Sequence, residues 1–244
     1  FSPRADDEYG RVAVKVQSHP AGGILSLTDN AFEGGSVVEL YTPINGDLVL
    51  EPGVPYRTMN APSRYGSTER FVLHADARLT VLPGAELTIG QRSVEVEGEL
   101  VAIGTAQDPV YFLDDSNYGF SISDGGQATL AHGQFDRGGL YVQEGGEASV
   151  EAWTFDGSRF EVRASQSPTI TDVSFIDTDF DCRGECEVQR GQFNGGTVDV
   201  YGEAKFTNST FSDWTRGYAI HASEAERLEL LGNTFTPRVD EDDP

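Results

Sequence analysis

The stretch Phe120-Ser-Ile-Ser-Asp-Gly-Gly-Gln-Ala-Thr-Leu-Ala-His-Gly-Gln-Phe135 is followed, after four intervening residues, by Leu140-Tyr-Val-Gln-Glu-Gly-Gly-Glu-Ala-Ser-Val-Glu-Ala-Trp-Thr-Phe155. Each copy begins with an apolar-x-apolar pair, passes through an acidic residue and two glycines, and ends on a phenylalanine. Apolar residues at every second position are typical of a β-strand with one buried face, and paired glycines are typical of turns. The stretch therefore predicts a coil of short strands separated by turns.

The terminal phenylalanine recurs through the second half of the chain at intervals of 20, 20, 18, 18 and 24 residues: Phe135, Phe155, Phe175, Phe193, Phe211 and Phe235. Five residues before each one stands an apolar residue: Leu130, Val150, Ile170, Val188, Phe206 and Leu230. Coils this short cannot hold a β-α-β unit or a propeller blade, and their strands bury an inner face only when successive copies stack. We therefore expect an all-β, right-handed parallel β-helix of about eight or nine coils, with inward side chains in continuous columns.

The repeat also predicts how the chain is divided. Residues 47–238 should form the β-helix, and residues 1–46, which are β-prone but do not keep the repeat, should form an N-terminal cap over the exposed strand edges. Residues 55–68, which begin at Pro55, are expected to be an irregular loop leaving an early coil. The acidic residues 239–244 are expected to be a disordered tail.

Three earlier segments extend the pattern, with Pro-Gly and Gly-Thr-Ala at the corners: Leu79–Ile89, Val94–Leu100 and Ile103–Phe112. Together with the repeat, they resemble the parallel β-helix repeats of the pectin-lyase-like superfamily over about two thirds of the chain. The resemblance implies the fold but no activity, because this superfamily includes lyases, hydrolases, adhesins and inert scaffolds. Of the elements expected in polygalacturonase-like enzymes, only Asp114-Asp115 is present; His132 lacks the preceding glycine and no Arg-x-Lys occurs.

The charge of the chain restricts its partners. Forty acidic residues against seventeen basic ones give a net charge of −23, which repels nucleic acids and anionic membranes. No apolar run approaches the ~18–20 residues that span a bilayer, so no transmembrane segment is predicted. The chain begins at Phe1 instead of Met. We expect a secreted or cell-surface protein whose targeting segment is absent from this sequence.

One outward face of the β-helix carries the candidate site. Beside the first strand of successive coils, one predicted column runs Ser121, Tyr141, Glu161, Asp181, Asp199 and Ala219, and the next runs Ser123, Gln143, Arg163, Arg183, Tyr201 and His221. Adjacent coils lie ~4.8 Å apart, so three carboxylates should stand in one line with two arginines beside them.

Three interpretations fit this column. Carboxylate oxygens bind calcium readily, so Glu161, Asp181 and Asp199 are candidate calcium ligands, the only cofactor expected. Carboxylates about 5 Å apart also suit retaining glycoside hydrolysis. Alternatively, Arg163 and Arg183 simply neutralise Glu161 and Asp181 on a solvated wall.

Tyr141, Tyr201 and His221 flank the acids and favour stacking on a sugar ring. We therefore include them with Arg163 and Arg183 among the candidate binding residues.

Cys182 and Cys186 should both point inward across a turn of Arg183-Gly-Glu185. Two cysteines cannot make a thiolate zinc site on their own, and their spacing differs from the redox C-x-x-C motif. A small structural disulfide or a pair of buried thiols is expected.

The absence of a recognisable acid–base set favours a non-catalytic β-helix that acts in binding or adhesion, with a glycan or another surface protein as its partner. The alternatives are a polysaccharide lyase or hydrolase acting on an extracellular glycan, and a structural rod within a larger surface assembly.

Overall fold

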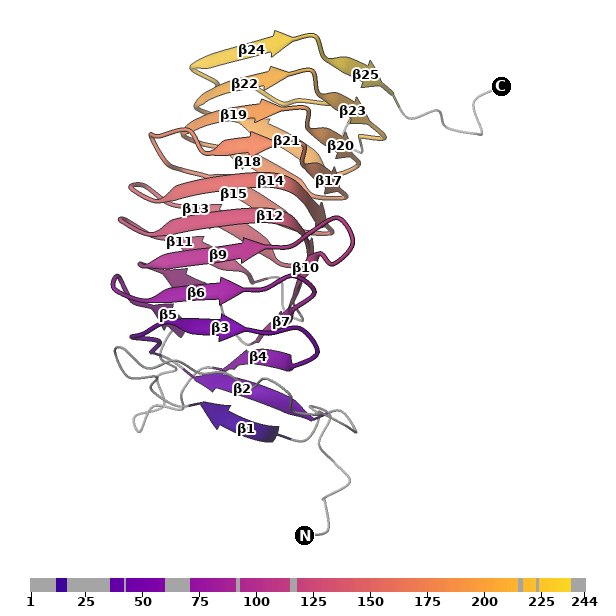
Figure 1. Ribbon diagram of the computed structural model, residues 1–244. Helices are drawn as coiled ribbons and strands as arrows, with labels where there is room; N and C mark the ends of the chain where they lie inside the picture. Colours follow the sequence, from indigo (N-terminus) through magenta and orange to yellow (C-terminus); the bar gives the residue numbers. More distant parts are fainter. Residues whose placement is uncertain are drawn as a thin grey trace.

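A computed structural model describes residues 12–16, 36–41, 43–59, 71–90, 93–114, 118–214, 217–222 and 224–237. These residues form an all-β solenoid of about nine turns, in which each strand pairs in parallel with its counterpart in the next turn. In Figure 1 the chain runs from left to right along the near side, returns along the far side and climbs, which makes the path right-handed. The predicted fold class is confirmed. No helix in the described ranges is long and apolar enough to cross a membrane.

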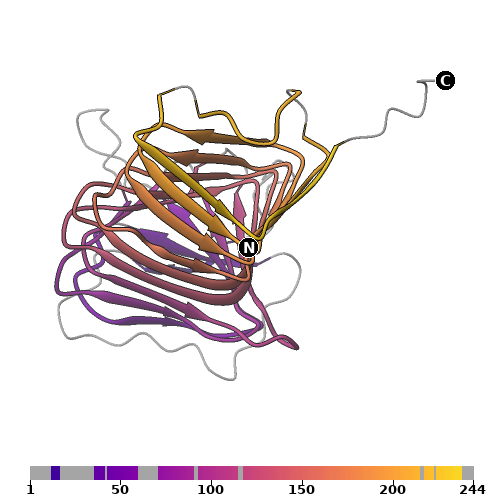
Figure 2. The same cartoon turned by 90° about the horizontal axis from the view of Figure 1, so that it is seen from above.

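Each full coil contributes strands to three faces, which enclose a common interior when the solenoid is seen from above (Figure 2). Face 1 is a separate seven-stranded sheet: β5 (Phe71–Leu73), β8 (Val94–Val96), β11 (Phe120–Ile122), β13 (Gly139–Val142), β15 (Arg159–Val162), β18 (Asp179–Cys182) and β21 (Thr197–Val200). Face 2 contains β3 (Leu48–Leu50), β6 (Arg78–Val81), β9 (Glu99–Ile103), the first halves of β12 (Gln127–Asp136) and β14 (Glu147–Asp156), β16 (Thr169–Thr171), β19 (Glu185–Gln189), β22 (Glu203–Thr207) and β24 (Arg227–Leu231).

Face 3 contains β1 (Val12–Val16), β2 (Val37–Tyr41), β4 (Pro55–Met59), β7 (Glu86–Ile89), β10 (Val110–Asp114), the second halves of β12 and β14, β17 (Ser174–Ile176), β20 (Gln192–Asn194), β23 (Thr210–Ser212) and β25 (Thr234–Thr236). Faces 2 and 3 count as one 18-stranded sheet because β12 and β14 run through both.

The phenylalanine repeat builds the core of the solenoid. From Phe135 to Phe235 the consecutive rings stack within 13° of parallel, with centroids 4.7–5.4 Å apart. All but the last of these rings are buried. Because a slip of one residue would turn a whole strand inside out, this column fixes the register of face 3 from coil to coil.

The corners beside face 3 are made by single residues with positive φ. They lie three residues before or two residues after the repeated phenylalanine: His132, Arg137, Ala152, Asp172, Asp177, Arg190, Asn208 and Asp213 are the non-glycine examples. Glycine adopts this left-handed conformation without strain and Asn or Asp tolerates it, whereas alanine does not. Ala152, with φ of 49°, is therefore a strained corner.

Replacing Ala152 with glycine should raise the free energy of unfolding by about 0.5–1 kcal/mol, because the Cβ that disfavours positive φ is removed. The measurement is the urea midpoint at unchanged m-value. Ala131→Gly, in the extended part of β12, is the matched control and should destabilise the fold. A loss of stability in both variants would contradict this account of the corner.

The N-terminal part is less regular than the rest, yet β1 and β2 continue face 3, since β2 pairs in parallel with both β1 and β4. The loop predicted from Pro55 is wrong for residues 55–59, which form β4 with Tyr56 and Thr58 buried. Proline at the first position of a strand is compatible with pairing. Residues 60–68 and the predicted tail, 239–244, lie outside the described residues.

Candidate functional site

The structure places four of the predicted site residues in one line on face 1. Tyr141, Glu161, Asp181 and Asp199 are direct partners in the successive pairings of β13, β15, β18 and β21. Each stands between two buried apolar residues of its strand, so its side chain projects from the outer side of the sheet.

His221 lies one column away from its predicted position. It forms a single β-bridge with Asp199, and so takes the position in the Asp199 column that the sequence assigned to Ala219. The segment 217–222 forms no continuous strand, so the apolar alternation of the earlier coils does not set its register. His221 Nδ1 consequently lies 2.9 Å from Asp199 Oδ1.

The carboxylates of the column are buried, so the wall of ion pairs is solvated at its arginines but not at its acids. Glu161, Asp181 and Asp199 are 3%, 6% and 8% exposed, although they lie on the outer side of the sheet. Arginine side chains that remain about half exposed contact Glu161 and Asp181 and shield these carboxylates from water. The column is thus a layer of carboxylates beneath guanidinium groups.

Glu161 is the centre of this layer because three arginines reach it. Arg159 Nη2 lies 3.3 Å from Oε2, Arg183 Nε lies 3.4 Å from Oε1, and Arg163 Nε donates a hydrogen bond to Oε1. Arg163 and Arg183 therefore both pair with Glu161, whereas the sequence suggested that they would divide between Glu161 and Asp181. Asp181 instead accepts a hydrogen bond from Arg159 Nη2.

Arg159 was missed by the sequence interpretation. It precedes the apolar pair of β15 by one residue, in line with Gly139 and Asp179 on the neighbouring strands. Following this third outward column would have revealed it, because Arg159 projects to the same side as Glu161, two residues further along the strand.

Two groups of the site have shifted pKa values, Arg159 and Tyr141. Burial alone would lower the pKa of Arg159, but its hydrogen bond to Asp181 and the charges of Asp181 and Glu161 outweigh burial and raise that pKa. Burial also raises the pKa of Tyr141, against an opposing effect of Arg159, so this residue is a neutral phenol. The surface over the column thus offers the cation of Arg159 and the hydroxyl group of Tyr141.

Aromatic rings border the guanidinium layer at its C-terminal end. The guanidinium carbon of Arg183 lies 4.8 Å from the centroid of the Tyr201 ring, which is a cation–π contact. The rings of Tyr218 and His221 lie 5.1 Å apart. Together with Tyr141 at the other end, they place aromatic groups on both sides of the arginines, as the sequence suggested.

A disulfide joins Cys182, at the end of β18, to Cys186 in β19. It closes the turn that carries Arg183, and both cysteines are buried. A Cβ added to Gly184 in this turn would lie 2.0 Å from the carbonyl oxygen of Ala164, so only glycine fits. These two features hold Arg183 in place above Glu161.

Calcium binding at Glu161, Asp181 and Asp199 stays a prediction. No group of three or more His, Cys, Asp or Glu side chains in the described ranges is placed to hold a metal ion. Oxygens of Glu161 and Asp181 face guanidinium groups.

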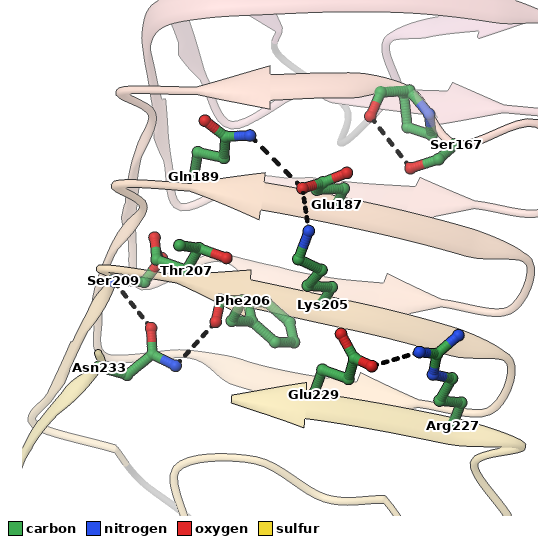
Figure 3. Close-up of polar contacts among 11 residues, drawn as sticks. Ser167, Glu187, Gln189, Lys205, Phe206, Thr207, Ser209, Arg227, Glu229 and Asn233 are labelled. Carbon is green, nitrogen blue, oxygen red and sulfur yellow. Dashed lines mark hydrogen bonds and ion pairs between the residues drawn. The ribbon is translucent and has the colours of Figure 1, made fainter. Parts of the chain in front are cut away.

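Face 2 carries a separate charged ladder (Figure 3). Lys205 Nζ of β22 lies 2.7 Å from Glu187 Oε1 of β19. On the following strand, β24, Arg227 pairs with Glu229 of the same strand. Beyond them the side chain of Asn233 bridges two backbone groups, donating to Phe206 O and accepting from Ser209 N. The Glu187–Lys205 pair and the two bonds of Asn233 tie the last three coils together, whereas the Arg227–Glu229 pair lies within β24.

The Glu187–Lys205 pair gives a pH-dependent contribution to stability. The hydrogen bond from Lys205 lowers the pKa of Glu187 from its ordinary value of 4.5, against a smaller opposing effect of burial. A depressed folded pKa stabilises the protein above the unfolded pKa, and this stabilisation is lost as pH falls through the folded pKa. Because both side chains are about 40% exposed, solvent screens the pair and the contribution to stability should be small.

We therefore expect Glu187→Gln to be less stable than the parent protein at about pH 7, and the difference in stability to be smaller at about pH 4, below the unfolded pKa. Urea unfolding at both pH values measures the difference. A stability gap that persists in acid would show that the carboxylate charge is not its source.

Comparison with known proteins gave no match: no family model fits the chain, and neither a curated protein nor a solved structure is similar to it.

Proposed function

We propose that this chain is a non-catalytic, secreted or cell-surface β-helix that binds a glycan through the arginine and tyrosine surface of face 1. Arg159, Arg163 and Arg183 supply exposed N–H donors for sugar hydroxyls or carboxylates. Tyr141 and Tyr201 supply ring faces at the two ends of the arginine layer. These residues lie on four successive rungs ~4.8 Å apart, so an extended polymer could contact several of them.

One observation favours binding over catalysis. Each carboxylate of the column already has a cationic or histidine partner: three arginines for Glu161, Arg159 for Asp181 and His221 for Asp199. A glycosidase needs one carboxylic acid free to donate a proton to the leaving oxygen and a second carboxylate facing the sugar. Carboxylates buried beneath guanidiniums are poorly placed for either role, whereas the guanidiniums are well placed to bind.

The resemblance to pectin-lyase-like β-helices supports the same ligand class, since that superfamily includes proteins that act on polysaccharides. A lyase or hydrolase is the enzymatic alternative, and a structural rod within a surface assembly is the third. We expect glycan binding to persist in a calcium chelator, because the arginines, not a metal ion, make the proposed contacts.

Arg163→Gln should weaken glycan binding about tenfold, the effect of losing one charge-assisted hydrogen bond. A glycan array run with and without calcium identifies the ligand, and titration calorimetry of the strongest hit gives the affinities. Arg137→Gln is the matched control, since Arg137 is similarly exposed, also pairs with a carboxylate, and lies at a corner beside face 3. Equal affinities of the two variants would place the binding surface elsewhere.

A further inference from the structure

The last described rung of the solenoid, formed by β24 and β25, is open along the edge that faces away from the other coils (Figure 1). Among the described strands, β24 pairs only with β22, and β25 pairs only with β23. The backbone N–H and C=O groups on the far edge of both strands therefore meet no described strand. An edge of this kind can pair with a strand of another chain, and natural solenoids usually cover it.

The same rung exposes apolar side chains at positions that the earlier coils bury. Leu230 is 43% exposed, whereas Phe206, its partner on the preceding rung, is fully buried. Phe235 is 44% exposed, although its ring stacks on the buried ring of Phe211. Tyr218, in the same coil, is also exposed. The inward positions of this rung thus form an apolar end surface that no further described coil covers.

The outward side chains of β24 indicate which partner fits this edge. Arg227 and Glu229 lie on either side of the inward Leu228, and their side chains are 62% and 36% exposed in spite of their mutual contact (Figure 3). When two β24 strands pair antiparallel about Leu228, Arg227 of each copy lies directly opposite Glu229 of the other.

The neighbouring registers of this antiparallel pair are less favourable. A shift of the centre to Glu229 would place two glutamates directly opposite each other, and like charges in that position destabilise a strand pair. A half-step shift would place the inward Leu228 opposite the outward Glu229. The charges of β24 are therefore complementary to those of a second β24 in one antiparallel register.

We propose that the open rung is a dimer interface, on which a second copy of this chain docks about a two-fold axis through Leu228. The two β24 strands then join face 2 of one copy to face 2 of the other. Because the axis runs from face 2 toward the interior, the apolar end surfaces with Leu230 and Phe235 lie against each other. A two-fold contact closes on itself, whereas head-to-tail stacking would leave an open end at every step and form filaments.

The size of the last coil sets the expected strength of this contact. It contributes about twenty described residues, and a standard interface uses about 20–30 residues on each side. The dimer should therefore be of moderate affinity. The proposal is independent of the glycan site, which lies on face 1.

Sedimentation velocity of the whole chain tests the interface. We expect mostly monomer at about 1 μM and mostly dimer at about 100 μM, as for an interface near the lower size limit. Glu229→Arg places arginine opposite arginine in the cross-strand pairs, and Arg227→Glu places glutamate opposite glutamate. Each variant alone should therefore dimerise at least about tenfold more weakly than the parent protein.

An equimolar mixture of the two variants should recover the dimer, because every arginine of one variant then faces a glutamate of the other. Recovery on mixing cannot result from damage to the last coil, since damage in each variant would persist in the mixture. Arg78→Glu is the matched control. It makes the same change of charge on face 2 in a distant coil, and should leave the dimer unchanged.

Several results would overturn the proposal. One is a parent protein that is still monomeric at about 100 μM, where an interface of this size should be occupied. Another is a series of species larger than the dimer, which would indicate head-to-tail stacking. A dimer that both charge variants retain would place the contact elsewhere, and variants that stay monomeric when mixed would exclude pairing through β24.

Discussion

Phe175→Ala should lower the free energy of unfolding by about 3–5 kcal/mol, the largest effect expected of a single substitution in this chain. The ring is 1% exposed and stacks between Phe155 and Phe193, with centroids at 5.4 and 4.7 Å. Its flanks meet the edges of Phe160 and Phe180 from face 1. Removing it leaves a cavity at the point where both aromatic columns meet, and the rigid backbone ladders on either side cannot close it.

Because each coil contacts only its neighbours, this cavity should also weaken the coupling between the two halves of the solenoid. Urea unfolding is therefore expected to show a lower midpoint and a lower apparent m-value. Ser174→Ala, the outward neighbour on the same strand, is the control and should change stability by less than about 0.5 kcal/mol. A loss in Phe175→Ala as small as that of the control would contradict the stacked-column account of the core.

Glu161→Gln should destabilise the protein by about 2–3 kcal/mol, because three guanidiniums lose the carboxylate that they share. The effect is smaller than for a fully buried ion pair because the three arginines are about half exposed and can regain water. Chemical denaturation near neutral pH measures it. A loss below about 0.5 kcal/mol would indicate that the column behaves as an ordinary solvated surface.

The arginines also supply an internal control for Glu161→Gln. Adding Arg183→Gln to Glu161→Gln should recover part of the lost stability, because one unpaired cation is removed and Arg183 contacts Glu161 directly. Simple addition of the two losses would mean that the residues act independently.

The architecture could be predicted from the sequence because alternation and period act together. Inward positions such as Leu130 and Phe135 recur at fixed offsets, and in a stacked coil the offset determines both the face and the column. The same logic placed Glu161, Asp181 and Asp199 in one line. In a stacked coil, residues at equivalent positions of successive repeats are therefore neighbours in space.

The environment of the column could not be predicted in the same way. Alternation says on which side of the sheet Glu161 lies, but not that long arginine side chains fold over it. Arg159 was missed because it precedes the apolar pair that defined the strand. His221 was displaced by two residues because its segment has only one β-bridge to the sheet, with no strand alternation to fix its register.

The change in coil length after Phe175 shows a further limit. The sequence contains the change from 20 to 18 residues, but not where in the coil the two residues leave the ladder. Pro168, immediately before β16, marks the place, because a residue without an N–H cannot complete the pairing of this strand with its neighbours β14 and β19.

The central claim is that the arginine-covered column binds a glycan without cleaving it. The most direct test is mass spectrometry of a bound glycan after prolonged incubation with an equimolar amount of the protein, compared with incubation alone. We predict a protein–glycan complex in which the glycan mass is unchanged, and a weaker complex with Arg163→Gln. Fragments carrying an added water or a new unsaturated end, lost in Glu161→Gln, would contradict the claim and identify the column as a hydrolase or lyase site.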